Sequence, residues 1–271
     1  MASVMTSAFD LDRVVWDEEY RQKVKRYFSE QSAASRSDPE IDTLLPQDDQ
    51  DFLCSFKTVF EPIVNLRTGK VFAHEALTRG INGASVGYLF DVLAGARLYQ
   101  FDHLCRTRAM KEISQRHMEG KLSLNVMPGA IDHPRYGLHA TFEVIKELGI
   151  APDRLIFELS ERECLDALGN SDLAEYRSQG ALFAIDDFGT GHAGLQSLLG
   201  FQPDIIKLDI SLIRDIDKDS VRQTLLKGIL SFCAEMNIHI IAEGVETPAE
   251  REVLFSLGVD LIQGFILTGG N

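Results

Sequence analysis

Residues 181–191, with the sequence ALFAIDDFGTG, carry the pattern that decides the fold. Their apolar run is typical of a buried strand, and it ends in Asp186 and Asp187, followed by a glycine-rich turn. Two neighbouring carboxylates repel each other and are costly to remove from water, so we expect a compensating cation, most simply a divalent metal ion. The alternative is an Asp-Gly turn that merely closes a strand, which is the commoner case for an isolated segment. The other strand ends decide between the two.

The length and composition of the chain restrict its class. Of its 271 residues, 45% are hydrophobic and 25% charged, which is typical of a soluble globular protein. No apolar run approaches the roughly 20 residues of a membrane helix, and no secretory signal pattern begins the chain, so we expect a cytoplasmic protein without membrane insertion. The net charge of −14 disfavours binding to nucleic-acid polymers, although an anionic ligand held by metal ions remains compatible with it. The four cysteines form neither a zinc-binding pattern nor a disulfide framework.

The chain changes character near residue 50, and we therefore divide it into residues 1–50 and a main domain, residues 51–271. Apolar side chains recur at helical spacing in residues 10–31 and predict one amphipathic helix. The stretch that follows is rich in Ser, Asp and Pro and predicts a linker. Several interpretations of the helix stay open: it covers the main domain, it contacts a sensor, or it packs on a second copy of the chain in a homodimer, which is the arrangement that we expect.

Strand and helix patterns alternate through the main domain. Eight strand patterns fall at residues 56–65, 71–77, 122–126, 155–159, 182–186, 205–208, 239–242 and 261–265, and helix patterns include 141–148, 220–236 and 249–257. Eight strands in one domain favour an α/β fold of the (β/α)8 type, a TIM-like barrel, over an open doubly wound sheet. Only residues 66–70 separate the first two strands, too few for a crossover helix, so these strands should form an antiparallel hairpin.

The carboxyl ends of the expected strands carry mostly acidic and amide side chains. In chain order they are Glu75 and Arg79, Asn125, Glu158 and Glu161, Asp186 and Asp187, Lys207 and Asp209, Glu243 and Glu246, and Gln263. Because barrel chemistry is located at this end of the strands, we expect these side chains to converge. Carboxylate and amide oxygens suit hard cations such as Mg²⁺ or Mn²⁺, and one shared carboxylate can bridge two ions about 3.5 to 4 Å apart. The pattern therefore predicts a site for two divalent cations.

Seven short segments resemble, in order, the EAL-domain phosphodiesterases, which hydrolyse the bacterial messenger cyclic di-GMP. They are EALTR at 75–79, LNVMP at 124–128, ELSE at 158–161, DDFGTG at 186–191, PDIIKLD at 203–209, AEGVET at 242–247 and QGF at 263–265. One tripeptide carries little weight, but seven ordered segments make coincidence implausible. The resemblance implies an EAL-type barrel with an antiparallel first strand, in agreement with the expected hairpin.

The resemblance also implies roles for individual residues. One cation would be held by Glu75, Asn125, Glu158 and Asp186, and the second by Asp186 and Asp187, with Glu243 and Gln263 close by. Lys207 would orient or deprotonate the attacking water, in a catalytic group that also includes Glu75, Asp187 and Glu243. Substrate would be bound by Leu77, Arg79, Asp209 and Gln263, and Glu161 would anchor the loop after Asp187. The implied reaction is the two-metal hydrolysis of cyclic di-GMP to linear pGpG.

Other interpretations of these residues remain open. Lys207 can instead form a structural ion pair with Asp209 or Glu243, and Arg79 can pair with an acid. A non-catalytic member of the family would bind cyclic di-GMP or a protein partner, but such members typically lose metal ligands, and here all are present. A Schiff-base aldolase built on Lys207 would leave the strand-end acids without a purpose.

Overall fold

The computed structural model describes residues 56–80, 96–127, 129–160, 171–190, 198–199 and 201–267. The chain divides into two compact units, and the larger one comprises Phe60–Leu77 and Tyr99–Asn271. The barrel interior and the candidate site lie in the described part of this larger unit. The expected boundary at residue 50 and the predicted helix at residues 10–31 lie outside the described residues.

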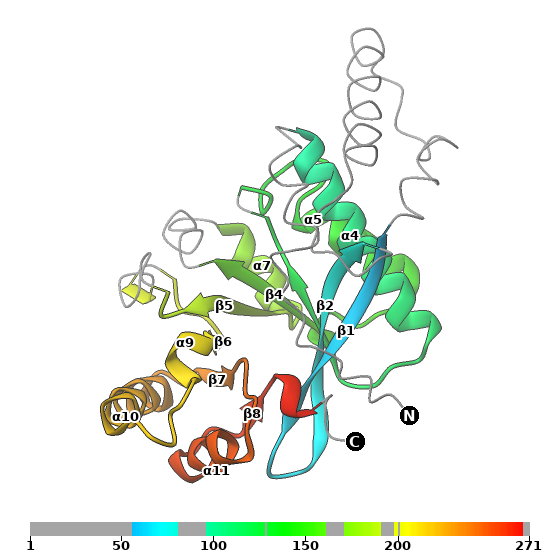
Figure 1. Cartoon of the computed structure of the whole chain (residues 1–271). Helices are drawn as coiled ribbons and strands as arrows, with labels where there is room; N and C mark the ends of the chain where they lie inside the picture. The colour runs from blue at the N-terminus through cyan, green and yellow to red at the C-terminus, as the bar shows by residue number, and fades with distance from the viewer. Residues whose placement is uncertain are drawn as a thin grey trace, which may run out of the picture. The chain divides into compact units, whose positions relative to one another are not determined.

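Among the described residues, eight strands form a closed barrel in the order β1 to β8 (Figure 1). Their bounds are β1 Phe56–Asn65, β2 Lys70–Gly80, β3 Lys121–Asn125, β4 Leu155–Ser160, β5 Leu182–Phe188, β6 Ile205–Leu208, β7 His239–Ala242 and β8 Leu261–Ile262. Each of the strands β2 to β7 runs parallel to the strand that follows it. Strand β1 pairs antiparallel with β8, and therefore runs against β2 as well. The predicted α/β barrel with an antiparallel first strand is confirmed.

The hairpin between β1 and β2 is closed by the side chain of Asn65. Its Oδ1 accepts hydrogen bonds of 3.0 Å from the backbone N–H groups of both Arg67 and Thr68. Gly69 adopts a left-handed φ of 68° and donates its N–H to the carbonyl of Asn65 at 2.8 Å. A short polar side chain and a glycine are what a tight turn requires, and here they close the hairpin that the short link between the two strands predicted.

Helices follow most of the later strands. They are α4 Ala96–Gln115, α5 Leu138–Leu148, α7 Ser171–Ser178, α9 Ile210–Ile213, α10 Ser220–Glu235 and α11 Pro248–Leu257, with two 3-10 turns, η2 Pro152–Arg154 and η3 Phe265–Leu267. The three helix patterns named from the sequence correspond to α5, α10 and α11. None of the helices among the described residues is long and apolar enough to span a membrane.

The last strand is shorter than its apolar pattern predicted. Strand β8 ends at Ile262, so the expected strand over residues 261–265 was wrong for its last three residues. Gly264 has a φ of 147°, and a Cβ there would lie 2.5 Å from the backbone N and O of Val245. The chain therefore turns tightly against the segment after β7, and Phe265 begins η3 instead of extending the strand.

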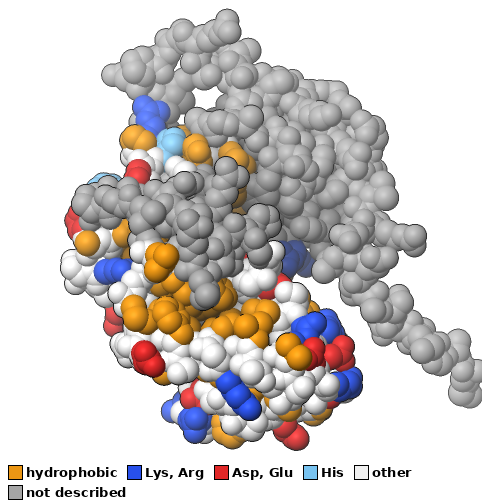
Figure 2. Space-filling view, turned by 90° about the vertical axis from the view of Figure 1, so that its left-hand side faces the viewer, with side chains coloured by type: hydrophobic (Ala, Val, Ile, Leu, Met, Phe, Trp, Pro, Cys, Tyr) orange, Lys and Arg blue, Asp and Glu red, His pale blue; other side chains and the backbone are white. Residues whose placement is uncertain are grey.

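One face of α10 is apolar and exposed. Val221 is 75% exposed and Leu225 is 52% exposed, while Phe232 and the C-cap residue Met236 are each 37% exposed. Their spacing places them on one stripe. Figure 2 shows hydrophobic side chains gathered in the middle of the face that it views, with basic and acidic side chains intermixed among the described residues around them. The described part of this face therefore has no broad basic patch of the kind that nucleic-acid polymers require.

The start of α11 depends on Glu250, which is 2% exposed. Its carboxylate accepts backbone N–H bonds from Asp215 at 3.0 Å, Glu246 at 3.1 Å and Thr247 at 3.0 Å. The Thr247 hydroxyl in turn accepts the N–H of Glu250, which completes a capping box.

We expect Glu250→Ala to lower the free energy of unfolding by about 1 to 3 kcal/mol, because buried N–H donors lose their acceptor. Thermal unfolding should show a lower Tm than that of wild type. The control is Glu252→Ala, an exposed position of the same helix, which should leave the Tm unchanged. Equal Tm values for the two variants would contradict this role of Glu250.

Candidate functional site

The barrel interior consists of an apolar layer with a polar layer on top of it. The apolar layer contains Ile63, Ala73, Ile156, Ala184, Ile205, Ile241 and Leu261. A step of two residues along a strand returns to the same face of the sheet. Six of these apolar residues are each followed, two positions later on the same strand face, by a polar residue. The polar residues are Glu75, Glu158, Asp186, Lys207, Glu243 and Gln263, which follow Ala73, Ile156, Ala184, Ile205, Ile241 and Leu261. Strand alternation thus brings six of the predicted residues together at the carboxyl ends of the strands.

The side chain of Lys207 lies at the centre of the polar layer and is 1% exposed. Its Nζ lies 2.7 Å from Glu243 Oε1, 2.8 Å from Asp186 Oδ1, 3.0 Å from Glu158 Oε1 and 3.3 Å from Glu75 Oε2. The structural ion pair with Glu243 that the sequence left open is therefore present, within a larger set of four carboxylates.

Hydrogen bonds fix the remaining polar side chains. Glu75 accepts from Asn125 Nδ2 at 3.2 Å and from Gln263 Nε2 at 2.6 Å. Ser123 Oγ donates to Glu158 Oε1 at 2.6 Å, and Gln263 Nε2 also lies 3.3 Å from Glu61 Oε2. The predicted Asn125 and Gln263 therefore join the same layer as the acids.

Sequence reasoning missed Glu61 and Ser123. Ser123 precedes Asn125 by two residues on β3, and so shares its face. Glu61 lies two residues before Ile63, and because β1 is antiparallel, the step toward the site runs backward along the chain. Both residues follow from the two-residue period once the direction of each strand is known.

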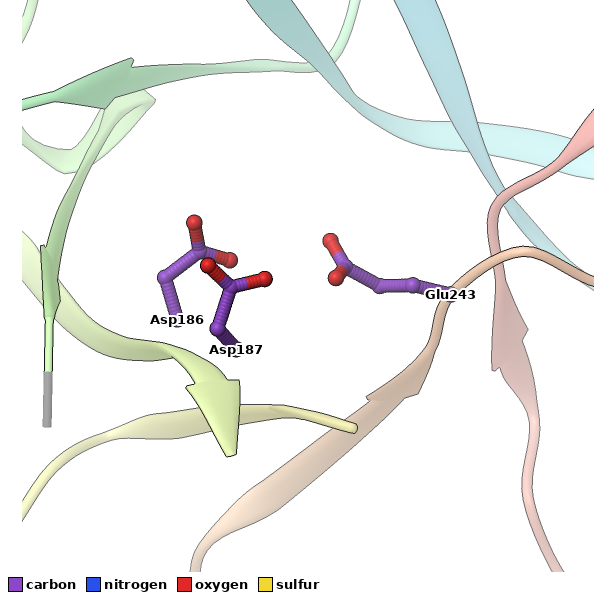
Figure 3. Close-up of side chains that lie close together, drawn as sticks. All are labelled: Asp186, Asp187 and Glu243. Carbon is purple, nitrogen blue, oxygen red and sulfur yellow. The ribbon is translucent and has the colours of Figure 1, made fainter. Parts of the chain in front are cut away.

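An irregularity in β5 allows the two adjacent aspartates to serve one site. Successive residues of a regular strand point to opposite faces. The register between β5 and β6 shifts between Ile185 and Phe188, and Asp187 adopts a left-handed φ of 52°, which Asp tolerates better than most residues. Asp186 and Asp187 lie next to each other and face Glu243 from across the opening (Figure 3). One oxygen from each of these three carboxylates lies within 4.8 Å of the other two.

Burial and mutual repulsion perturb the acids of the polar layer. Burial raises the pKa of Glu158 well above its usual range, and the neighbouring carboxylates add to the shift. Burial likewise raises the pKa of Glu243 to about 8, with a further contribution from nearby acids. The pKa of Asp187 is also raised, first by burial and then by Asp186. Without added cations the layer therefore retains protons that isolated carboxyl groups would lose.

For two groups of the polar layer, the pKa shifts in the direction that favours the charged form. For Glu75, burial would raise the pKa, but Lys207 and the hydrogen bonds from Gln263 and Asn125 outweigh it and lower the pKa. For Lys207, burial disfavours the ammonium, yet the surrounding carboxylates raise its pKa well above the usual range. Lys207 is therefore a hydrogen-bond donor in this arrangement.

The residues of the layer fit a hard divalent cation. All the candidate ligands offer carboxylate or amide oxygens, which such cations prefer. In addition, Glu158 Oε2 and Gln263 Oε1 are buried without a hydrogen-bond partner. A buried acceptor without a partner requires an explanation, and a cation or its bound water supplies one.

The raised pKa of Glu243 predicts how stability depends on pH when no metal is added. Between its ordinary value of 4.5 and about 8, the folded protein holds a proton that the unfolded chain has lost. This contribution stabilises the fold at the lower end of that window and disappears as the pH rises through it.

We therefore expect the Tm in EDTA to fall across this window more in wild type than in Glu243→Gln, which cannot titrate. Saturating Mn²⁺ should reduce the fall in wild type, because the cation replaces the proton. Thermal unfolding at a series of pH values tests this. A wild-type Tm in EDTA that varies with pH in the same way as that of Glu243→Gln would contradict the assignment.

Other predicted residues have different surroundings. Asp209 caps α9, where its Oδ1 accepts the N–H of Ser211 at 2.8 Å, and its charge contributes to the raised pKa of Asp187. Leu77 lies two residues after Glu75 on β2 and so shares its face. Arg79 belongs to the smaller compact unit, in which its guanidinium donates to the carbonyl of Thr78 at 3.2 Å.

Two more acids complete the set. Glu161 lies outside the described residues. Glu246 forms an ion pair with Arg214, with one contact of 2.7 Å between Arg214 Nη2 and Glu246 Oε1, and both side chains are exposed. Glu246 therefore pairs with a surface arginine and not with Lys207.

The sequence and fold match one known family. The family model of the EAL domain matches residues 50–268. The chain belongs to the EAL domain family. The resemblance drawn from the seven sequence segments is thus confirmed.

This EAL domain is similar to solved structures of other proteins. A standalone versatile EAL protein from Vibrio cholerae O395, solved in its c-di-GMP bound form, is 35% identical, with a TM-score of 0.69 over 78% of this chain and 90% of that one. BlrP1 from Klebsiella pneumoniae, solved as a manganese/cy-diGMP complex, is 31% identical, with a TM-score of 0.71 over 83% of this chain and 56% of that one.

Curated relatives of this EAL domain are longer proteins. The cyclic di-GMP phosphodiesterase PdeR of Escherichia coli (strain K12) is 38% identical over 127 residues, which are 46% of this chain and 19% of that protein. The chain spans 57% of the length of another curated relative, and 41% and 29% of two more.

Proposed function

We propose that this EAL domain is a metal-dependent phosphodiesterase that hydrolyses cyclic di-GMP to linear pGpG. The observation that carries the proposal is the polar layer, in which carboxylates from four parallel strands converge on Lys207 within 3.3 Å. Two similar structures hold the cyclic dinucleotide, and a curated relative is named as its phosphodiesterase. The family and the site support the same substrate class.

Two divalent cations, Mg²⁺ or Mn²⁺, are the proposed cofactors. Glu75, Asn125, Glu158 and Asp186 would hold one, and Asp186 and Asp187 the other, with Glu243 as a further ligand. When bound, such cations lower the pKa of water, neutralise phosphodiester charge and stabilise the departing 3′ oxygen. The 2.6 Å hydrogen bond from Gln263 orients Glu75 for this task.

The remaining residues act on the water and the substrate. Lys207 lies among the proposed metal ligands and carries N–H donors, so we propose that it orients or deprotonates the attacking water. Leu77, Arg79, Asp209 and Gln263 are the proposed substrate contacts, with Arg79 suited to bind a phosphate. Glu161 is the proposed anchor of the loop after Asp187.

Several expectations about the whole protein stay predictions. They are the division into residues 1–50 and 51–271, homodimer formation through the helix at residues 10–31, and a cytoplasmic location. A non-catalytic receptor for cyclic di-GMP remains the alternative outcome of the activity test.

The direct test is incubation of the purified chain with cyclic di-GMP and Mn²⁺, with chromatography of the products. We expect linear pGpG to accumulate with wild type and with Glu252→Gln, an exposed control on α11, and not with Glu75→Gln, which loses a ligand charge. Unchanged cyclic di-GMP in the wild-type reaction, together with calorimetric binding of the dinucleotide, would instead identify a receptor.

A further inference from the structure

The ammonium of Lys207 and the proposed cations depend on the same oxygen atoms. Lys207 Nζ lies within 3.3 Å of a carboxylate oxygen from each of Glu75, Glu158, Asp186 and Glu243. These side chains come from four strands, β2, β4, β5 and the end of β7. Each of the four is also a proposed metal ligand.

The carboxylate oxygens around Lys207 outnumber its donors. An ammonium group has three N–H donors and accepts no hydrogen bond, whereas four carboxylate oxygens lie within 3.3 Å of Nζ. Within the described part of the chain, Lys207 is the one cation that forms ion pairs with these carboxylates. Two of the four acids are held apart from water, since Glu158 is 1% and Glu75 is 6% exposed, while Asp186 and Glu243 are partly exposed. Without Lys207 these acids would repel one another or have to take up further protons, and either would destabilise the metal-free site.

We propose that Lys207 is the internal counter-ion of the metal-free site. It holds the metal ligands together before metal binds, and the incoming cations then take over its carboxylate contacts. This inference rests on the proposed function, because it takes the four carboxylates as metal ligands.

The exchange links metal binding to the role of Lys207 toward water. While its N–H groups are engaged by carboxylates, they are not available to a water molecule or a phosphate oxygen. Bound cations would take the place of Lys207 as partners of the carboxylates. N–H donors of Lys207 would then be free to bind a water molecule or a phosphate oxygen. The site therefore gains its water-orienting donor only when it is loaded.

The counter-ion role predicts the direction in which removal of the Lys207 charge changes the affinity for metal. Lys207→Met removes the charge and keeps an unbranched side chain of similar length. The loss of the counter-ion destabilises the metal-free protein more than the loaded one, in which cations neutralise the acids. By the thermodynamic cycle, the variant must then bind metal more tightly than wild type.

The test measures Mn²⁺ binding to the full chain without substrate, by electron paramagnetic resonance of free Mn²⁺ or by calorimetry. We expect the Kd for Mn²⁺ to fall at least about tenfold in Lys207→Met. The control is Lys227→Met, an exposed lysine of α10, which should keep the wild-type Kd. Equal or weaker Mn²⁺ binding by Lys207→Met would overturn the proposal.

Thermal unfolding covers the case in which the variant is unstable. In EDTA the Tm of Lys207→Met should be lower than that of wild type, and saturating Mn²⁺ should close most of the gap. The combined variant Lys207→Met with Asp186→Asn removes one negative charge together with the positive one, and should unfold in EDTA at a higher temperature than Lys207→Met alone. A Lys207→Met chain that stays unfolded in Mn²⁺, or a combined variant that is no more stable, would overturn the counter-ion role.

The wild-type arm separates this inference from the proposed function. If wild type binds no Mn²⁺, the proposed function fails. If wild type binds Mn²⁺ and hydrolyses cyclic di-GMP while Lys207→Met gains no affinity, only the counter-ion role fails.

Discussion

EDTA should abolish the hydrolysis of cyclic di-GMP by this EAL domain, and excess Mg²⁺ or Mn²⁺ should restore it. Without cations the polar layer presents carboxylates to a phosphodiester of the same charge, while the donors of Lys207 are engaged by those carboxylates. Activation of water and neutralisation of the substrate both depend on the bound ions. The measurement is the initial rate of pGpG formation before chelation, after chelation and after cation addition.

The choice of cation gives a second arm to the same experiment. Ca²⁺ accepts the same oxygen ligands but coordinates them at longer distances and in a looser geometry, so it should bind and support little turnover. Cations that prefer thiolate ligands should not restore activity better than Mg²⁺ or Mn²⁺, because the layer offers oxygen ligands. Undiminished activity in excess EDTA would contradict the two-metal proposal.

Asp187→Asn should reduce turnover by about 10² to 10³ while leaving the affinity for cyclic di-GMP nearly unchanged. The substitution keeps the size of the side chain, and Asn tolerates the left-handed φ of 52° as well as Asp does. It removes one negative charge from the proposed second cation site. Because we propose that this site contributes more to the activation of water than to substrate binding, turnover should fall more than affinity. The measurement is kcat together with a calorimetric Kd for the dinucleotide.

Asp215→Asn is the matched control. Asp215 also has a left-handed backbone, with a φ of 56°, and its carboxylate pairs with Lys218 at 2.7 Å on the surface. The same chemical change in the same backbone conformation should therefore leave turnover at the wild-type value. If Asp187→Asn hydrolyses cyclic di-GMP at that value too, Asp186 and Asp187 are not paired metal ligands.

Much of the barrel and of its polar layer could be predicted from the sequence. The alternation of patterns and the short link at residues 66–70 predicted a barrel with an antiparallel first strand. A two-residue period within each strand then predicted which acids share a face, as for Glu158 after Ile156 and Glu243 after Ile241. These features depend only on the order of residues within one strand, which can be read from the sequence.

Features that depend on contacts between strands were not predictable in this way. A strict two-residue period would place Asp187 on the face opposite to Asp186, and only the shifted register with β6 brings both to one site. Glu61 was missed because its approach to Gln263 requires the closed barrel, in which β1 runs against its neighbours. The simultaneous contact of Lys207 with acids from four strands likewise exists only after closure.

The position of Arg79 illustrates a different gap. Its sequence segment indicates a phosphate contact. In the structure it belongs to the smaller compact unit, where its guanidinium donates a hydrogen bond to the carbonyl of Thr78. Its role therefore stays a proposal that rests on the family resemblance. The comparison of Arg79→Ala with wild type in dinucleotide binding addresses it directly.

The central claim is that water, activated at the polar layer, opens the ring of cyclic di-GMP at phosphorus. The most direct measurement is mass spectrometry of the product formed by the Mn²⁺-loaded chain in H₂¹⁸O. Attack of water on one phosphorus with departure of its 3′ oxygen predicts linear pGpG that carries one ¹⁸O in the terminal 5′ phosphate and none in the remaining diester. Recovery of unlabelled cyclic di-GMP, or a linear product without ¹⁸O in that phosphate, would contradict it.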